Sequence, residues 1–291
     1  LFLQEGVAMR LYHKAVKMLS HDLSAGLRQQ SFFLPVTVLF VLTACFAWDG
    51  KFLRWCDFTG CAAQKPGVCD YLVFLLEGME PHDFNRSNGF RFPAIWMMFF
   101  VLFLISVARY AKSDMYGIGQ QLLLKSGSRD LWWFSKMVWA FVSAALYDSV
   151  IVVTVMLYLT ARHGFRWSCT DFTASLVPGV AELSFAEQLL WLLAIPVFTL
   201  CVIGSLEVLI EVLVSPVVGV ATILALLLAA LYFNLRIVPG GTCILLHSEL
   251  AGSGGFALTQ ALIFPVLLQL ICSTLGHLIF RRFDLLGNHE V

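Results

Sequence analysis

Long apolar runs recur along the chain at spacings that predict helices crossing a membrane. They lie at 31–48, 93–109, 133–160, 188–213, 216–233 and 257–280. About 20 helical residues cross the roughly 30 Å of hydrocarbon in a bilayer, so each run is long enough or nearly so. The pattern predicts an all-α polytopic membrane protein with six transmembrane helices in one domain, residues 31–291. A tight hairpin is expected at Ser215 and Pro216, because proline lacks an amide N–H and restricts the residue before it.

Residues 1–30 show a different pattern, in which apolar and polar residues recur on opposite faces of a helix. The apolar positions are Tyr12, Val16, Leu19, Leu23 and Leu27, and the polar ones are Arg10, Lys14, Lys17, His21 and Arg28. Spacings of three and four are typical of an amphipathic helix. We expect it to lie on the cytoplasmic face of the membrane, with its basic face on anionic lipid headgroups. The alternative is a helix packed on a soluble domain, and no signal peptide is expected here.

Composition agrees with a membrane setting and excludes one class of partner. Apolar residues make up 59% of the chain and charged residues 13%, with a mean hydropathy of +0.82. These values lie outside the usual range of soluble domains. Nineteen basic and nineteen acidic side chains give a net charge of zero, so nothing favours binding to nucleic acid.

The basic residues near the apolar runs predict the orientation. With the N-terminus inside, eleven of the nineteen face the cytoplasm, namely Arg10, Lys14, Lys17, Arg28, Arg109, Lys112, Lys125, Arg129, Lys136, Arg281 and Arg282. Short cytoplasmic segments are enriched in Lys and Arg. The sequence therefore predicts a multi-pass protein of the cytoplasmic membrane with both termini in the cytoplasm.

The loop 49–92 is predicted to form a small extracellular cap. It contains Cys56, Cys61 and Cys69, whose spacing does not match paired zinc knuckles and which have no histidine among them. We favour a disulfide, with Cys169 and Cys243 on other outer loops as candidate partners for the odd cysteine. The pairing stays open. The remaining cysteines that lie within spans are expected to be small packing residues, and they are Cys45, Cys201 and Cys272.

A second outer segment, 234–256, contains glycine-rich turns around a short apolar piece. One interpretation is a re-entrant half-helix that shapes an outer gate, since irregular backbone at membrane depth survives only when buried in protein or facing water. The other is a plain surface loop.

The segment 111–132 is the long cytoplasmic connection between two spans. Its first part predicts a short helix that carries Met115, Ile118, Leu122 and Leu123, and Gly127 marks a turn before the third span. Such an amphipathic helix is either a docking surface for another protein or a helix resting on the bilayer.

Several features together resemble the ABC type-2 permease family. They are the basic N-terminal helix, the six spans, and the end of the cytoplasmic segment, KSGSRDLWWFSK, with Gly127, Ser128, Arg129, Trp132 and Lys136. The hairpin at 215–219 and the closing stretch at 280–284 are similar as well. The resemblance covers nearly the whole chain, but the loop 49–92 is longer than the family pattern.

The resemblance implies an exporter permease that acts with separate ABC ATP-binding subunits and a second permease subunit, in a homodimer or a heterodimer. It assigns coupling to the ATPase to Met115, Ile118, Leu122, Lys125, Gly127, Ser128 and Arg129. A peptide, lipid-like or other amphipathic substrate is expected. The sequence has no G-x-x-x-x-G-K-[ST] loop, so we expect no enzymatic activity or cofactor in this chain, with ATP and Mg²⁺ bound by the partner.

Three acidic residues fall within predicted spans, namely Asp148, Glu207 and Glu211. An acidic residue at the centre of a membrane helix costs about 2.5 to 3.5 kcal/mol, so they should face the bundle interior, a cavity or a dimer partner. They either line a translocation path or are neutral carboxyls hydrogen-bonded to neighbouring helices. The histidines are scattered without ligand spacing, so no metal site is expected.

Two other functions compete with the exporter. A non-ABC membrane sensor or immunity protein would bind a ligand through its extracellular loop. A secondary transporter would show inverted repeats, and the two sets of three spans show no clear match.

Overall fold

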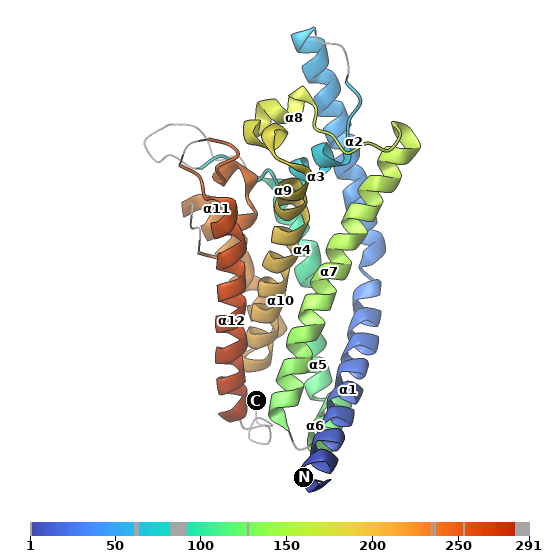
Figure 1. Cartoon of the computed structure of the whole chain (residues 1–291), viewed down its shortest axis with the longest axis vertical. Coiled ribbons are helices and arrows are strands. Elements are labelled where there is room, and N and C mark those ends of the chain that lie inside the picture. The colour runs from blue at the N-terminus through green and yellow to red at the C-terminus, as the bar shows by residue number, and fades with distance from the viewer. Residues whose placement is uncertain are drawn as a thin grey trace.

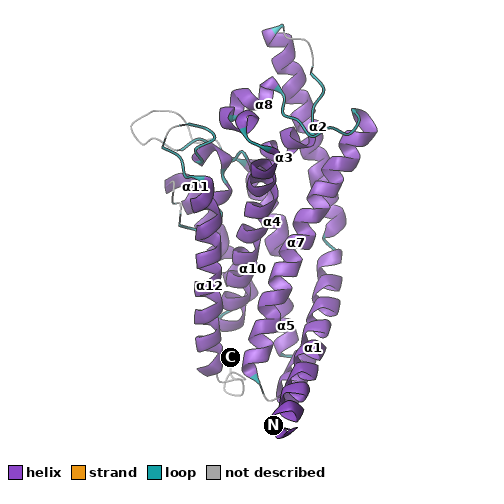
Figure 2. Ribbon diagram, viewed as in Figure 1, coloured by secondary structure: helices purple, strands orange, loops and turns teal. Residues whose placement is uncertain are grey.

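The structure is a computed structural model. It describes residues 2–60, 64–81, 92–126, 128–233, 235, 237–252 and 254–282, with the backbone alone for 2–11 and 125–126. Over these ranges the protein is all-α, without a named strand. Figure 2 shows that the loops gather at the two ends of the helices.

Helices make up most of the described residues. The long ones are α1 (Phe2–Ser31), α2 (Leu34–Thr59), α4 (Ala94–Val107), α7 (Arg129–Arg162), α10 (Ile195–Leu213), α11 (Pro216–Phe233) and α12 (Leu258–Arg282). The short ones are α3 (Val68–Leu76), α5 (Tyr110–Met115), α6 (Ile118–Ser126), α8 (Asp171–Leu176) and α9 (Phe185–Leu189). Four single turns complete the set, η1 (Pro178–Glu182), η2 (Leu190–Ala194), η3 (Gly241–Cys243) and η4 (Leu245–His247).

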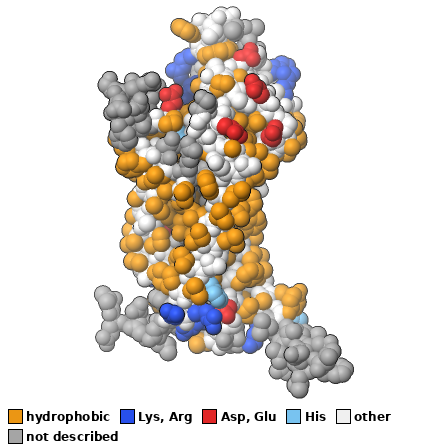
Figure 3. Space-filling view, turned by 60° about the vertical axis from the view of Figure 1, so that its left-hand side comes forward, with side chains coloured by type: hydrophobic (Ala, Val, Ile, Leu, Met, Phe, Trp, Pro, Cys, Tyr) orange, Lys and Arg blue, Asp and Glu red, His pale blue; other side chains and the backbone are white. Residues whose placement is uncertain are grey.

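Six helical segments among the described residues are long and apolar enough to cross a membrane, as the sequence predicted. They are Leu34–Thr59, Ala94–Met115, Arg129–Arg162, Phe185–Leu213, Pro216–Phe233 and Leu258–Arg282. Figure 3 shows hydrophobic side chains over the middle of the molecule and charged side chains toward its two ends. This chain is a multi-span helical membrane protein.

The two ends of the bundle differ in what they contain. α1 begins and α12 ends at one of them, here called the termini end, where α5 and α6 also lie (Figure 1). α3 and α8 lie at the opposite end, here called the cap end. α10 is the central helix and packs on α7, α12, α11 and α4. The π-helical turn η2 comes directly before α10. Pro196, which lacks an N–H, is the second residue of α10.

The N-terminal helix forms as predicted and packs on the helix bundle, while its place at the membrane surface stays a prediction. α1 runs beside α7 (Figure 1) and also packs on α4. Its buried face contains Met18, Asp22, Gly26 and Gln30, whereas Tyr12 of the predicted apolar face is exposed. Gly26 permits this packing, because a Cβ there would lie 2.1 Å from Nε1 of Trp139. The polar Asp22 and Gln30 therefore point into the bundle, which a purely hydrophobic pattern cannot reveal.

The outer segment 234–256 has an irregular backbone among its described residues, and its role in an outer gate stays a prediction. It forms the turns η3 and η4, and most of its described residues between 240 and 250 are buried. The backbone is held by neighbours: Leu246 N–H donates to Glu77 O at 3.2 Å, and Trp96 Nε1 donates to Cys243 O at 3.1 Å. Irregular backbone is thus buried in protein at the cap end, which satisfies its polar groups.

Candidate functional site

The end of the second span and the connection that follows it bend twice and form what we call the elbow, residues 108–128. α4 ends at Val107 and the chain turns at Arg109, which has a left-handed φ of 73°. α5 and α6 follow, separated by a turn at Tyr116 and Gly117. The predicted single helix is therefore two helices, and Met115 lies on a different one from Ile118 and Leu122.

A buried ammonium group anchors the elbow. The side chain of Lys136 on α7 is 0% exposed, and its Nζ lies 2.5 Å from Asp22 Oδ1 and 2.7 Å from Asp114 Oδ2. Asp22 belongs to α1 and Asp114 to α5, so one cation joins three helices. Removing one partner of a buried ion pair leaves an uncompensated charge, which typically costs about 3 to 5 kcal/mol.

Further donors complete this ion network. Tyr110 Oη donates to Asp22 Oδ1 at 2.8 Å, and the Ser135 hydroxyl donates to the other oxygen of that carboxylate. His21 Nε2 lies 2.9 Å from Asp114 Oδ1. Lys136 Nζ also lies 4.3 Å from the centre of the Tyr110 ring, close enough for a cation–π contact.

Three members of the network have the spacing of metal ligands. One ligand atom each from His21, Asp22 and Asp114 lies within 4.8 Å of the others. The Lys136 ammonium, however, already lies against both carboxylates. The donor set therefore fits a lysine-centred ion network better than a divalent metal.

The elbow exposes apolar side chains beyond this anchor. Ile118 is 61% exposed and Leu124 is 74% exposed, and Tyr116, just before Ile118 in the chain, is exposed as well. Met115 and Leu123 are buried and hold the elbow to the bundle. The predicted coupling residues therefore divide into anchoring and exposed ones; Leu122 is half-buried. Gly127 and the side chain of Lys125 lie outside the described residues.

The start of α7 is tied to the end of α12. The Ser128 side chain caps α7 by accepting from Leu131 N–H at 3.4 Å, and Arg129 Nη1 donates to Arg281 O at 2.8 Å. The rings of Trp132 and Phe280 stack with centroids 4.6 Å apart. Ser128 thus caps α7, and Arg129 connects the start of α7 to the last span.

The three intramembrane carboxyls lie in the bundle interior, as predicted. Asp148 is buried on α7, and Glu207 and Glu211 are buried one turn apart on α10. Glu211 Oε1 accepts the backbone N–H of Lys112 at 2.8 Å, whereas neither oxygen of Glu207 has a hydrogen-bond partner. The role of these residues in a translocation path stays a prediction.

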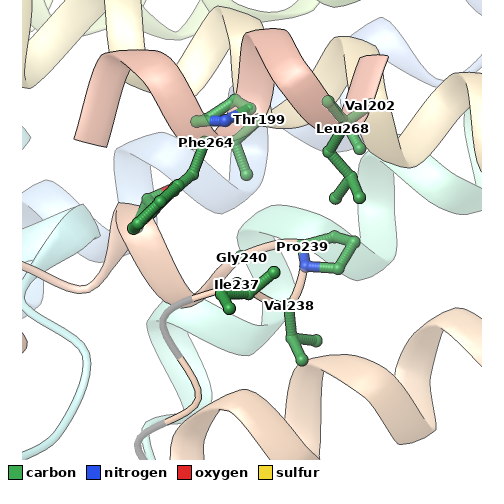
Figure 4. Close-up of a pocket in the computed structure, with 10 residues that line it drawn as sticks. Thr199, Val202, Ile237, Val238, Pro239, Gly240, Phe264 and Leu268 are labelled. Atoms are coloured by element: carbon green, nitrogen blue, oxygen red, sulfur yellow. The ribbon is translucent and has the colours of Figure 1, made fainter. Parts of the chain in front are cut away.

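A small cavity lies between α10, α12 and the segment after α11 (Figure 4). Its lining includes Thr199, Val202, Val238, Gly240, Phe264 and Leu268. The Thr199 hydroxyl is buried there without a hydrogen-bond partner. None of the three carboxyls lines this cavity.

The cap end is held by a disulfide and by neutral donors. Cys69 pairs with Cys169, one of the two candidate partners, and Cys61 lies outside the described residues. Asp70, the residue after Cys69, accepts hydrogen bonds from Gly67 N–H and Thr170 N–H, both at 2.8 Å. It also accepts from the hydroxyls of Thr170 and Thr173. Burial raises the pKa of Asp70, and these hydrogen bonds oppose the rise.

The remaining cysteines behave as small buried residues. Cys45, Cys201 and Cys272 are buried within spans and form no disulfide, as expected. Cys243 is also buried without a disulfide, and burial raises the pKa of its thiol.

Sequence reasoning missed most of the ion network. Asp22 and Asp114 were not singled out, and Lys136 was noted only as a basic residue of the cytoplasmic side and as part of the motif KSGSRDLWWFSK. One signal was available: Asp22 lies four residues from both Met18 and Gly26, on the face that packs. Its meaning depends on Lys136, more than 100 residues away, which local periodicity cannot supply.

Comparisons with known proteins identify no relative. No protein-family model, curated protein or solved structure matches this chain. The fold and the site described above are therefore the basis for a functional proposal.

Proposed function

We propose that this chain is the transmembrane subunit of an ATP-driven ABC exporter in the cytoplasmic membrane, with both termini in the cytoplasm. Its partners would be separate ABC ATP-binding subunits, which bind ATP and Mg²⁺, and a second permease subunit. The substrate class is amphipathic: a peptide, a lipid or a similar molecule. The sequence resemblance motivates this proposal, and the elbow is the single structural observation that carries it.

The elbow has the form that a docking element needs. It lies at the termini end, and the apolar side chains of Tyr116, Ile118 and Leu124 are exposed on it. Exposed apolar residues beyond the membrane-facing helices favour a protein contact, because their burial releases water. About 25 cal/mol is gained per Å² of apolar surface buried.

The anchoring also fits a part that transmits force. Lys136, Asp22 and Asp114 connect the elbow to α7 and α1, and Arg129 at the start of α7 connects that helix to α12. A partner that moves the elbow would therefore move the ends of three long helices together. Transport work requires that the partner favour one arrangement of these helices over another.

The test uses two charged substitutions on the elbow and a matched control at the other end. Ile118→Asp and Leu124→Asp should each prevent a nucleotide-hydrolysing subunit from co-purifying, while membrane insertion is unchanged. Phe58→Asp, at a residue that is 91% exposed at the cap end, should leave co-purification intact. Equal co-purification from all three variants would contradict the docking role.

The cap end supports a second candidate function, a membrane sensor or immunity protein that binds a ligand outside. The observation in its favour is the built cap, in which the Cys69–Cys169 disulfide and the Asp70 hydrogen bonds join α3 to the segment before α8. Ligand binding that is lost on disruption of this cap, and that persists without any ATPase in the cell, would favour the sensor.

A further inference from the structure

Glu207 is a buried carboxyl that has no hydrogen-bond partner among the described residues. Its residue is 0% exposed, and both Oε1 and Oε2 lack a hydrogen-bond partner. Asp22, Asp49, Asp70 and Asp114 are also buried, and each is held by donors or a cation. A buried polar group without a partner is rare in folded proteins and calls for a physical explanation.

Glu207 occupies a notch in α11. Gly219 provides the space, because a Cβ at that position would lie 2.6 Å from Oε2 and 2.8 Å from Oε1. The N–H of Gly219 is not available to the carboxyl, since it donates to Ser215 O at 3.0 Å. The carboxyl therefore faces backbone and apolar surface.

No cation compensates a charge on Glu207 within the described part of the chain. On its own helix, the neighbour that acts on it electrostatically is Glu211, which has the same sign. α11 carries no Asp, Glu, Lys, Arg or His. From α5, Lys112 donates to Val214 O at 2.6 Å and through its backbone to Glu211.

Cations on the other helices that pack on α10 are engaged elsewhere. Lys136 of α7 is held between Asp22 and Asp114, and on α12 His277 and Arg281 lie within 4 Å of Asp130. An isolated ionised carboxyl in such a place costs far more than a neutral one, so the group takes up a proton instead.

We propose that Glu207 is a proton-binding site in the membrane interior, protonated while α11 packs against α10 at Gly219 and deprotonated when the two helices separate. On separation water enters, the O–H bond of Glu207 breaks, and the proton passes to the Glu211 carboxylate or to water. Glu211 is one turn nearer the end of α10 and has an oxygen without a partner, so it is placed to receive that proton. This inference does not depend on the exporter proposal.

The packing of α11 suits such a movement. In its membrane window 28% of the residues are buried, against 61% for the span that contains Glu207. α11 joins α10 through a short link that ends at Pro216, where the helical hydrogen bonding is interrupted. α11 packs mainly on α10 and only lightly on α4 and η3, so its movement away from Glu207 would break contacts chiefly with α10.

The experiment is infrared spectroscopy of the purified full chain in liposomes. At neutral pH the wild type should show the carbonyl stretch of a protonated carboxyl, and Glu207→Gln should remove the intensity of one such group. Glu182→Gln, at an exposed carboxyl, should leave the band unchanged. An unchanged band in Glu207→Gln would overturn the proposal.

A glycine substitution tests the link to α11. Gly219→Ala should weaken the same band, because the added Cβ forces α11 away and admits water to the carboxyl. Gly50→Ala is the matched control, since nothing lies within 4 Å of a Cβ there. A full band in Gly219→Ala would refute the link to α11.

A labelling measurement on the wild type covers the case in which Glu207→Gln fails to fold. A hydrophobic carbodiimide adds a protonated carboxyl across its C=N bond and leaves a stable N-acylurea. Mass spectrometry should find this adduct on the peptide that contains Glu207 at neutral pH, and less of it at alkaline pH. No adduct on Glu207 at either pH would overturn the proposal.

Discussion

The two ends of this bundle are fastened by different chemistry. At the termini end, Lys136 joins α1, α5 and α7 through ion pairs with Asp22 and Asp114. At the cap end, a covalent bond between Cys69 and Cys169 lies beside a carboxylate held by neutral donors. Ion pairs can separate and reform, whereas a disulfide persists until it is reduced. We therefore expect movement at the termini end and a fixed geometry at the cap end.

The ion network around Lys136 should be more sensitive to a single substitution than the disulfide at the cap end. Lys136→Met should lower the free energy of unfolding by about 3 to 5 kcal/mol, because Asp22 and Asp114 then face each other without a cation. Thermal unfolding in detergent measures the effect. The control is Arg162→Met at the cap end, where the arginine side chain is 48% exposed and lies 3.4 Å from Asp49; a loss below about 1 kcal/mol is expected. Equal losses would remove the contrast between the ends.

Loss of the disulfide should have the next largest effect on stability. Cys169→Ala should cost about 2 to 4 kcal/mol, since the disulfide closes a loop of 100 residues. The wild type should lose a similar amount when a reductant is added during thermal unfolding. Cys45→Ala serves as the control because Cys45 forms no disulfide, and reductant should still destabilise that variant. A wild type that is indifferent to reductant would show that the disulfide does not hold the cap.

A smaller substitution tests the elbow without removing a charge. Gly119→Ala should cost about 1 to 3 kcal/mol, because its Cβ would lie 2.1 Å from Asp114 Oδ2 and would push that carboxylate away from Lys136. Faster amide hydrogen exchange in α5 and α6, with no change at the cap end, should accompany the loss. Uniform exchange changes over the whole bundle would contradict a local role for the network.

The smallest expected effect is a pH dependence at the cap end. Burial raises the pKa of Glu77, and the nearby Lys51 opposes this. The folded state therefore holds this proton more tightly than the unfolded state, so the contribution is fully present at low pH and is lost as pH rises through the raised pKa. Glu77→Gln should remove that decline in stability, which a series of thermal unfolding curves against pH can measure. A steeper decline in the variant would show that the sign is wrong.

Local patterns in the sequence were enough for the spans and not for the contacts between them. Twenty or so apolar residues specify a transmembrane helix by length alone, so all six spans were predicted. The interior position of Asp148, Glu207 and Glu211 followed from the cost of exposing an acid to lipid. Both arguments need only the residues themselves.

The features that the sequence did not predict depend on contacts between residues far apart in the chain. The burial of Asp22 on α1 is compensated by Lys136, and the choice of Cys169 for Cys69 depends on where two loops meet in space. The outer segment 234–256 is buried because Glu77, Trp96 and Gly179 form hydrogen bonds with its backbone. None of these pairings leaves a periodic signal along the chain.

The most direct test of the proposed function is to purify the tagged chain from its native cells in mild detergent. Mass spectrometry would identify what co-purifies, and a nucleotide-hydrolysis assay would measure its activity. The exporter proposal predicts a stoichiometric partner with a phosphate-binding loop and hydrolysis that disappears with Leu124→Asp. A chain that purifies alone from these cells and shows no hydrolysis would contradict it.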